Sequence, residues 1–235
     1  MDWSLLIFAF NEEGSISKVI DKAIQFAYEN KNGITEIIIL DDGSTDNTKQ
    51  IIEEYRKSHP EIKPIYHEKN KGIGMALKSV YAQATCEYVC AIPADNQFDI
   101  ELLNVVSTFN DNQFFSFYRK NPYESWFRNM LHIFNKYLNR AIFGIRLNDV
   151  NWVKVYKLQQ LKSISTELTS SLIESEICIK IMKKGVMPIE HYSPYLPRET
   201  GVSKGGSFLT VKKAVNDLFL LYFVIQRFKN ERKDA

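Results

Sequence analysis

Side chains that offer oxygen ligands are concentrated in four short segments of this 235-residue sequence, and each segment follows an apolar run. The segments are Asn11-Glu12, Asp41-Asp42-Gly43-Ser44, residues 70–74 and Asp95-Asn96-Gln97. Asp95 offers a carboxylate and Gln97 an amide oxygen, which are ligands that Mg²⁺ and Mn²⁺ accept. The oxygens of a diphosphate could complete the coordination shell of such a metal, which would neutralise the negative charge of the diphosphate as it leaves. The alternative is an acidic turn that contacts only solvent.

The other segments suit a nucleotide. The carboxylate of Asp42 could accept hydrogen bonds from a ribose hydroxyl or a base N–H, or it could belong to a turn that caps the next helix. Gly72 precedes a helix N-terminus, which is a suitable place for phosphate, and Lys78 follows on the same helix. The pair Gly72 and Gly74 is weak evidence alone, because the third glycine of a dinucleotide-binding motif is missing.

Strand and helix signals alternate through the first hundred residues. Apolar runs at residues 5–10, 36–40, 63–67 and 87–92 predict four strands, and apolar residues at helical spacing between them predict helices. This alternation predicts an α/β fold with a mostly parallel sheet and right-handed crossovers. Ligands of such sheets bind at the carboxyl ends of the strands, so we expect the four polar segments to meet at one edge.

The pattern changes after residue 99. The expected elements are a mainly helical segment at 120–146, a strand at 151–156, a helix at 170–184, an extended segment at 188–197 and a final helix at 210–229. We expect one domain over residues 1–208, followed at 209–235 by an apolar helix with basic flanks. That helix could pack on the domain, on a second copy in a homodimer, or on a membrane surface.

Composition excludes several classes of protein. The formal net charge is only +2 and no block of Lys and Arg is present, which argues against nucleic acid as a partner. Three cysteines without paired spacing give no disulfide framework. Neither an export signal nor an apolar stretch of about 18 residues is visible. We therefore expect a cytoplasmic protein that is at most peripheral on the inner face of the cell membrane.

The polar segments, with their flanks, occur in the order seen in glycosyltransferase family two, which the sequence resembles from about residue 5 to residue 204. The matching segments are Phe8-Ala9-Phe10-Asn11-Glu12-Glu13, Asp41-Asp42-Gly43-Ser44-Thr45-Asp46-Asn47-Thr48, Asn70-Lys71-Gly72-Ile73-Gly74-Met75-Ala76 and Ala94-Asp95-Asn96-Gln97-Phe98. Within the family the sequence is most similar to the dolichyl- and polyprenyl-phosphate sugar synthases. The resemblance implies the type A glycosyltransferase fold, which has a Rossmann-like, mostly parallel sheet with helices on both faces.

The same resemblance implies an inverting, metal-dependent transfer of a sugar from a GDP- or UDP-sugar. The implied donor-binding residues are Phe8, Asn11, Glu12, Asp41, Asp42, Gly72, Lys78, Ala94 and Asp95. Asp95, the second acidic residue of the family's Asp-x-Asp motif, and Gln97 would hold Mg²⁺ or Mn²⁺. Two residues depart from the pattern, since Ala9 replaces a proline and Pro93 stands where the first Asp is expected. The metal shell therefore loses one carboxylate.

The acceptor side is implied by Arg198-Glu199-Thr200-Gly201-Val202-Ser203-Lys204, which resembles the family's Arg-x-x-Gly-x-Ser-Lys loop. Cationic and hydroxyl groups of this kind can hold a phosphate dianion. The expected acceptor-phosphate residues are Arg119, Arg128, Arg198, Ser203 and Lys204. The loop could equally close over the donor diphosphate as a lid.

The expected catalytic set is Asp95, Asp149, Glu174, Glu176 and Arg198. One of Asp149, Glu174 and Glu176 would be the general base if the acceptor is a hydroxyl, whereas a phosphate acceptor needs no base. Glu174 and Glu176 are two residues apart on a helix, roughly 200° around its axis, so both cannot face one atom unless the helix begins there.

The favoured acceptor is a polyprenyl-phosphate-type lipid. One alternative is transfer from the same donor onto a sugar hydroxyl, in glycan or cell-surface polysaccharide assembly. A second is a non-catalytic module that binds nucleotide sugars, which the missing carboxylate suggests. A nucleotidyltransferase would need a Gly-rich basic loop after the first strand, and residues 11–14 do not supply one.

Overall fold

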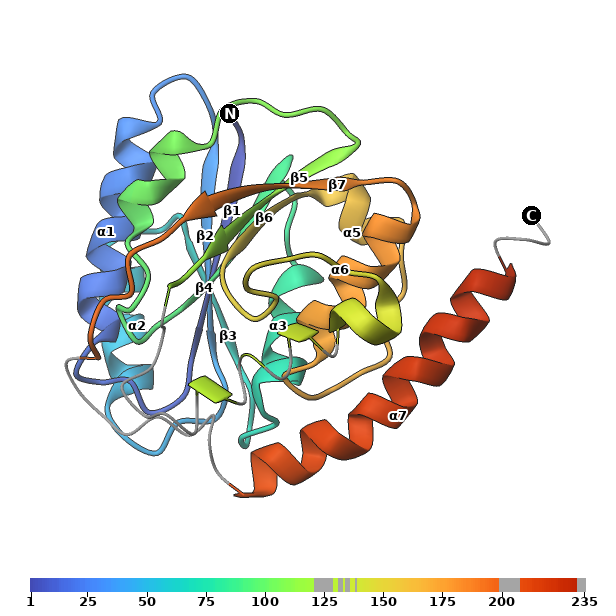
Figure 1. Ribbon diagram of the computed structural model, residues 1–235. Coiled ribbons are helices and arrows are strands. Elements are labelled where there is room, and N and C mark those ends of the chain that lie inside the picture. The colour runs from blue at the N-terminus through green and yellow to red at the C-terminus, as the bar shows by residue number, and fades with distance from the viewer. Residues whose placement is uncertain (121–128, 131–132, 134–135, 138, 199–207, 232–235) are drawn as a thin grey trace.

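The computed structural model describes residues 1–120, 129–130, 133, 136–137, 139–198 and 208–231, with the backbone alone at 208–216 and 231. Its strands are β1 (Trp3–Ala9), β2 (Thr35–Asp41), β3 (Ile62–Tyr66), β4 (Tyr88–Pro93), β5 (Gln113–Tyr118), β6 (Lys154–Lys157) and β7 (Met187–Tyr192). They form one seven-stranded sheet in the order β3-β2-β1-β4-β6-β5-β7, which runs through the centre of the molecule (Figure 1).

The sheet is mostly parallel, as the sequence predicts. β1 pairs in parallel with β2 and β4, and β2 pairs in parallel with β3. β6 is antiparallel to both of its neighbours, and β5 and β7 are parallel. The register places Phe8 between Leu40 and Pro93, so β1, β2 and β4 end at nearly the same level. The segments that follow these strands therefore share one edge of the sheet.

Helices cover both faces of the sheet. On one face are α1 (Ile16–Glu29), α2 (Thr48–Ser58) and the 3₁₀ helix η1 (Ile100–Val105). On the other face are α3 (Ile73–Tyr81), η2 (Asn139–Phe143), α5 (Leu158–Lys162), α6 (Ile173–Lys183) and α7 (Phe208–Glu231). The central strands β1, β2 and β4 are mainly apolar because alternate residues serve the two layers: Leu5 and Ile7 pack toward α1, whereas Leu6 packs toward α3.

The final helix, α7, packs against α6 and crosses the outside of the molecule (Figure 1). Its inner side buries Leu221, Val224 and Ile225. Phe219 and Phe223 project outward and are 68% and 67% exposed. Across the described residues, the search for a helix of sufficient length and hydrophobicity to span a bilayer found no candidate.

The structure differs from the sequence-based expectation at β5, β6 and α6. β5 was not predicted, because a short aromatic run cannot be told from a buried helical segment by its pattern alone. β6 begins at Lys154 because residues 149–152 form a turn, in which Asp149 Oδ1 accepts the N–H of Asn151 (3.2 Å). α6 begins only at Ile173 because Ser170 closes a turn before it, with its Oγ accepting the N–H of Leu172.

Candidate active site

The segments after β1 and β2 are joined into one platform. The N–H of Asn11 donates to Ser44 Oγ (2.8 Å), and Asn11 Oδ1 accepts the N–H of Thr45 (2.8 Å). The N–H of Glu12 donates to Thr48 Oγ1 (2.9 Å). Asn11 has φ 55°, a left-handed conformation that asparagine tolerates better than most residues. The turn at Asn11 therefore fixes the direction in which Glu12 leaves the sheet.

Asp42 lies beneath the segment that leads into α3. Its carboxylate accepts the N–H of Lys71 (2.9 Å) and of Gly72 (2.8 Å), and His67 Nδ1 lies 2.6 Å from Oδ1. Asp42 is only 3% exposed. The preceding Asp41 closes its own turn by accepting the N–H of Ser44 (3.0 Å). The structure thus brings Asp42 and Gly72 together, and the contact of Asp42 with a base or ribose stays a prediction.

Asp95 and Gln97 lie on a tight turn after β4. The turn depends on Asn96, which has φ 57°. The N–H of Gln97 donates to Asp95 Oδ1 (3.2 Å), and Gln97 Nε2 donates to the hydroxyl of Tyr195 (2.6 Å). Burial raises the pKa of Asp95, against the opposing effects of the Gln97 N–H and two arginines. The carboxylate is therefore in a setting where a positive partner is favourable.

Arg198 reaches this turn from the far end of the chain. Its Nη2 contacts Glu12 Oε1, and its Nη1 lies 3.8 Å from Asp95 Oδ2. Burial raises the pKa of Glu12, while Arg198 opposes this shift. Ser15 Oγ lies 3.0 Å from Glu12 Oε2 and 2.8 Å from the carbonyl oxygen of Ala94, which ties Glu12 to the β4 turn. The structure therefore places Arg198 beside residues predicted to bind the donor and the metal.

Arg119 and Asp149 form a buried ion pair next to the same turn. Arg119 Nε donates to Asp149 Oδ2 at 2.8 Å, and Asp149 is fully buried. The guanidinium of Arg119 lies 3.9 Å from the centre of the Trp152 ring and 5.8 Å from that of Tyr195. Tyr195 links this pair to Gln97. The contacts of Asp149 favour a role in positioning Arg119 over the predicted role of a base.

Glu174 and Glu176 do not join this cluster. Glu174 accepts hydrogen bonds from the hydroxyls of Tyr81 (2.7 Å) and Tyr156 (2.9 Å). Glu176 is fully buried and accepts two backbone N–H groups at 167–168 and the ammonium of Lys180 (2.7 Å). Both carboxylates are thus engaged in the layer formed by α3, β6 and α6. The contacts favour a structural role for them over the predicted role of a base.

Lys78 and Phe8 are also among the predicted residues that the structure describes. Lys78 Nζ donates to the carbonyl of Thr166 (2.8 Å), which directs it toward the loop before α6. Phe8 is partly buried against the core layer of α3, and its carbonyl accepts the N–H of Ala94 (3.1 Å). Arg128, Ser203 and Lys204 lie outside the described residues.

Asp95 and Gln97 fit a divalent metal by their chemistry. No group of three or more His, Cys, Asp or Glu side chains that could hold a metal is found in the described part of the chain. Gln97 is 8% exposed, and among the described residues its Oε1 has no hydrogen-bond partner. A carboxylate and a free amide oxygen are the ligands that Mg²⁺ and Mn²⁺ prefer, and phosphate oxygens could fill further positions. A bound metal would neutralise charge that develops on a leaving diphosphate.

Tyr195 and Ser15 are among the site residues that were not predicted from the sequence. Tyr195 lies between Pro194 and Pro197, and an aromatic residue in that position just before Arg198 was the available signal. Ser15 directly precedes α1, where a serine usually caps the helix, yet it makes no capping hydrogen bond and contacts Glu12 and Ala94 instead.

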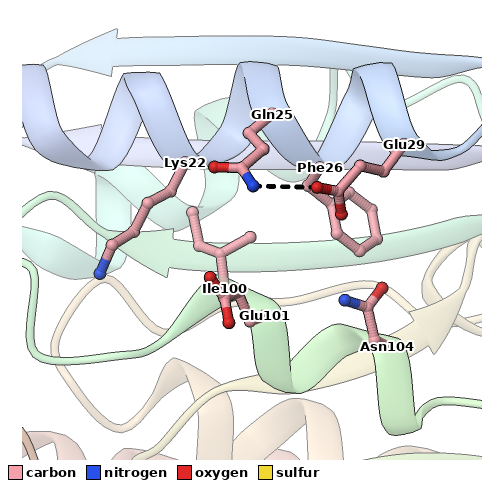
Figure 2. Close-up of a pocket in the computed structure, with 7 residues that line it drawn as sticks. All are labelled: Lys22, Gln25, Phe26, Glu29, Ile100, Glu101 and Asn104. Atoms are coloured by element: carbon pink, nitrogen blue, oxygen red, sulfur yellow. Dashed lines mark hydrogen bonds between the residues drawn. The ribbon is translucent and has the colours of Figure 1, made fainter.

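A small pocket lies elsewhere, between α1 and η1 (Figure 2). Along the α1 wall of the pocket, Gln25 Nε2 donates to Glu29 Oε1 at 2.9 Å. Its lining residues are Lys22, Gln25, Phe26, Glu29, Ile100, Glu101 and Asn104. None of these was predicted as a site residue, and the mixed charges offer no preference for a phosphate-rich ligand.

Comparison with solved structures identifies similar folds. The structure of glucosyl-3-phosphoglycerate synthase from Mycobacterium tuberculosis with Mn²⁺, uridine diphosphate and glucosyl-3-phosphoglycerate superposes with a TM-score of 0.67, covering 98% of this chain and 79% of that one at 16% identity. A mannosyltransferase from Pyrobaculum calidifontis with GDP-Man and Mn²⁺ gives a TM-score of 0.59 at 18% identity, covering 94% and 63%. At these identities the likeness shows the type A glycosyltransferase fold.

Curated relatives match over shorter stretches. Poly-β-1,6-N-acetyl-D-glucosamine synthase of Staphylococcus epidermidis is 36% identical over 96 residues, which are 41% of this chain and 22% of that protein. A dolichyl-phosphate β-glucosyltransferase of Trichomonas vaginalis is 30% identical over 102 residues, or 42% and 30%. The chain thus spans less than a third of the length of these relatives. The family model for glycosyl transferase family 2 matches residues 4–165. This chain therefore belongs to glycosyl transferase family 2.

Proposed function

We propose that this chain transfers a sugar from a nucleoside diphosphate sugar, with inversion, to a lipid-linked phosphate of the polyprenyl-phosphate type. The platform at Asn11 and the segment above Asp42 would hold the nucleoside. Asp95 and Gln97 would hold Mg²⁺ or Mn²⁺ against the donor diphosphate. The nucleophile would be a phosphate oxygen that is already charged, so the transfer requires no base.

The observation that carries this proposal is a pair of arginines beside the turn Asp95-Asn96-Gln97, which is called the metal turn below. Arg119 and Arg198 both lie close enough to Asp95 to lower its pKa, against the effect of burial. Each guanidinium can bind an anionic oxygen with two hydrogen bonds. Two such groups next to a metal site suit a reaction in which the donor and the acceptor both carry phosphate. The match to a dolichyl-phosphate β-glucosyltransferase supports the same acceptor.

Product analysis tests the acceptor. The protein would be incubated with Mn²⁺, labelled UDP-glucose, UDP-N-acetylglucosamine or GDP-mannose, and polyprenyl phosphate in detergent. The proposal predicts label that extracts into organic solvent and is released by mild acid, as expected of a sugar phosphate. Label that appears only in water-soluble, acid-stable glycan would replace it with the second candidate below. Binding of nucleotide sugar without any transfer would indicate a non-catalytic module.

The second candidate is transfer from the same donor onto a sugar hydroxyl. The 36% identity to a polysaccharide synthase favours it, although the match covers only 96 residues. This reaction needs a general base. Asp149 is held by Arg119, and Glu174 and Glu176 are engaged within the α3 and α6 layer. These contacts make the hydroxyl acceptor the weaker of the two candidates.

The outer face of α7 suits a membrane surface, which is where a lipid acceptor would be found. Phe219, Leu220, Tyr222 and Phe223 are exposed there, and Arg227 and Lys229 follow them on the same helix. Aromatic residues next to basic ones favour an interface of anionic lipid. Flotation with phosphatidylglycerol vesicles tests this, and Phe219→Ser with Phe223→Ser should abolish it. Dimerisation that the same substitutions abolish, without any flotation, would assign the face to a second copy.

A further inference from the structure

The metal turn has fewer carboxylates than the binding of a divalent metal ion is expected to require. Pro93 occupies the position where the family pattern has an acidic residue, so Asp95 is the turn's only carboxylate next to Gln97. Both Mg²⁺ and Mn²⁺ favour anionic oxygen ligands, and one carboxylate with one amide leaves a divalent ion poorly neutralised. A second carboxylate close to Asp95 would restore the missing charge.

Glu12 is such a carboxylate, on the neighbouring strand. β1 and β4 are adjacent and parallel, with Phe8 opposite Pro93, so the segments that carry Glu12 and Asp95 leave the same edge side by side. Ser15 lies within hydrogen-bonding distance of both Glu12 Oε2 and the carbonyl of Ala94. Glu12 is therefore held by its Oε2 atom against the residue that precedes Asp95, and its other oxygen, Oε1, faces Arg198.

Arg198 is a cation that both carboxylates face. Its two terminal nitrogens contact Glu12 Oε1 and approach Asp95 Oδ2 at 3.8 Å. The side chains of Glu12 and Asp95 are only 12% and 16% exposed. Two carboxylates so close together and so little solvated need a positive charge between them. In this structure the guanidinium supplies that charge.

We propose that Glu12 is a second carboxylate ligand of the divalent metal, and that Arg198 occupies the metal's place between Glu12 and Asp95 until the metal binds. This inference rests on the proposed function, because it concerns the metal of that reaction. The metal and the guanidinium compete for the same two oxygens. Metal binding therefore releases Arg198, which then becomes available to a phosphate of the donor or the acceptor.

Mn²⁺ affinity without nucleotide tests the proposal, measured on the full chain by electron paramagnetic resonance of free Mn²⁺. Glu12→Gln keeps the acceptor for Ser15 but removes the charge. It should weaken Mn²⁺ binding by at least about tenfold, since even residues that only orient metal ligands cost roughly 10- to 100-fold. Glu13→Gln is the matched control. Glu13 is adjacent, equally charged and bonded to Asn47 instead, so Mn²⁺ affinity should not change.

Arg198→Gln should change the Mn²⁺ affinity in the opposite direction from Glu12→Gln. Removal of a competing, partly buried ion pair should tighten Mn²⁺ binding by roughly three- to tenfold. In the wild-type protein, saturating Mn²⁺ should also speed the modification of Arg198 by phenylglyoxal, read by mass spectrometry. This second measurement needs no variant, so it does not depend on how a substitution folds.

The outcomes separate this inference from the proposed function. If Asp95→Asn abolishes Mn²⁺ binding while Glu12→Gln matches the wild type, Glu12 is not a ligand and the inference fails, although the proposed function stands. If Arg198→Gln weakens Mn²⁺ binding, or if Mn²⁺ leaves the labelling of Arg198 unchanged, the metal does not displace Arg198 from Glu12 and Asp95, and that part of the inference is refuted. If Asp95→Asn binds Mn²⁺ as the wild type does, the metal site of the proposed function is refuted with it.

Discussion

Gly72 donates its backbone N–H to Asp42 Oδ2 at 2.8 Å, which joins the end of β2 to the start of α3 across thirty positions of sequence. Gly72 has φ 85°, so it lies in the left-handed region where glycine carries little steric cost. A buried carboxylate thus fixes the backbone of the segment predicted to approach the donor. Asp42 would shape the nucleotide site through this backbone even where it makes no contact with the nucleotide.

Asp42→Ala should lower the free energy of unfolding by about 1–3 kcal/mol, because two backbone N–H groups lose a charged acceptor. Urea denaturation measures this. Asp111→Ala is the control, since the side chain of Asp111 is 77% exposed and its ion pair with Lys157 should contribute less than about 1 kcal/mol. Equal stability of Asp42→Ala and the wild type would show that the segment is held by other contacts.

Gly43→Ala should damage the donor platform more than a glycine substitution does elsewhere. Gly43 has φ 71°, and an added Cβ would meet the backbone of Lys69 at 2.5 Å. Gly144 has a similar φ of 75° but open space around it, so Gly144→Ala isolates the conformational cost of about 1–2 kcal/mol. Thermal unfolding should show the larger loss for Gly43→Ala, with weaker nucleotide binding. Equal losses of stability in the two variants would mean that the segment at Gly43 can move away from the segment at Lys69 without cost.

Glu36 should make stability depend on pH. Burial by itself would raise the pKa of Glu36, but hydrogen bonds from Lys63, Ser4 and Thr85 outweigh it and lower the pKa from 4.5 to about 2. A lowered carboxyl pKa stabilises the fold above the unfolded value, and this contribution is lost as the pH falls from about 4.5 through about 2. It is fully present at neutral pH.

Glu36→Gln should therefore cost about 1–3 kcal/mol at pH 7 and progressively less as the pH falls below about 4.5. Urea titrations at pH 7, 5, 4 and 3 measure the difference from the wild type. Glu68→Gln, at an exposed position, should show no such trend. A difference that is constant from pH 7 to pH 3 would contradict the predicted role of the ionised carboxylate.

Asp149→Asn distinguishes a positioning role from a base. Removing the charge leaves the buried guanidinium of Arg119 without its carboxylate, which should cost about 3–5 kcal/mol of stability. If Asp149 acted only as a base, Asp149→Asn would abolish sugar transfer while the stability of the protein stayed constant. Differential scanning calorimetry, together with a transfer assay, separates the two. Unchanged stability with lost transfer would restore Asp149 as a candidate base.

The sheet and the meeting of its polar segments could be predicted, because both follow from local signals. Alternating strands and helices impose a parallel sheet, and parallel strands end at one edge, so Asn11, Asp42 and Asp95 had to gather there. The family motifs likewise pointed to Gln97. The contact of Arg198 with Glu12 could not be predicted, since the two residues are 186 positions apart and no periodic pattern relates them.

The packing of α6 against the rest of the fold was the part of the site that could least be predicted from the sequence. Spacing on a helix indicates which residues share a face, but not which neighbours that face meets. Glu174 meets Tyr81 and Tyr156 because α6 packs on the α3 side of the sheet. Arg119 was predicted from family position alone, and its partner Asp149 was assigned a different role, because β5 was not recognised.

The most direct test of the proposed function is the binding of UDP and GDP to the wild type and to Asp95→Asn, measured by isothermal titration calorimetry with Mn²⁺ and again with EDTA. We expect one of the two nucleotides to bind the wild type in the presence of Mn²⁺. Its affinity should fall at least about tenfold in Asp95→Asn or with EDTA, because each would remove the metal that Asp95 and Gln97 are proposed to hold against the diphosphate. Identical affinity of the two proteins for the nucleotide, or no binding of either nucleotide, would refute the proposed donor and metal site.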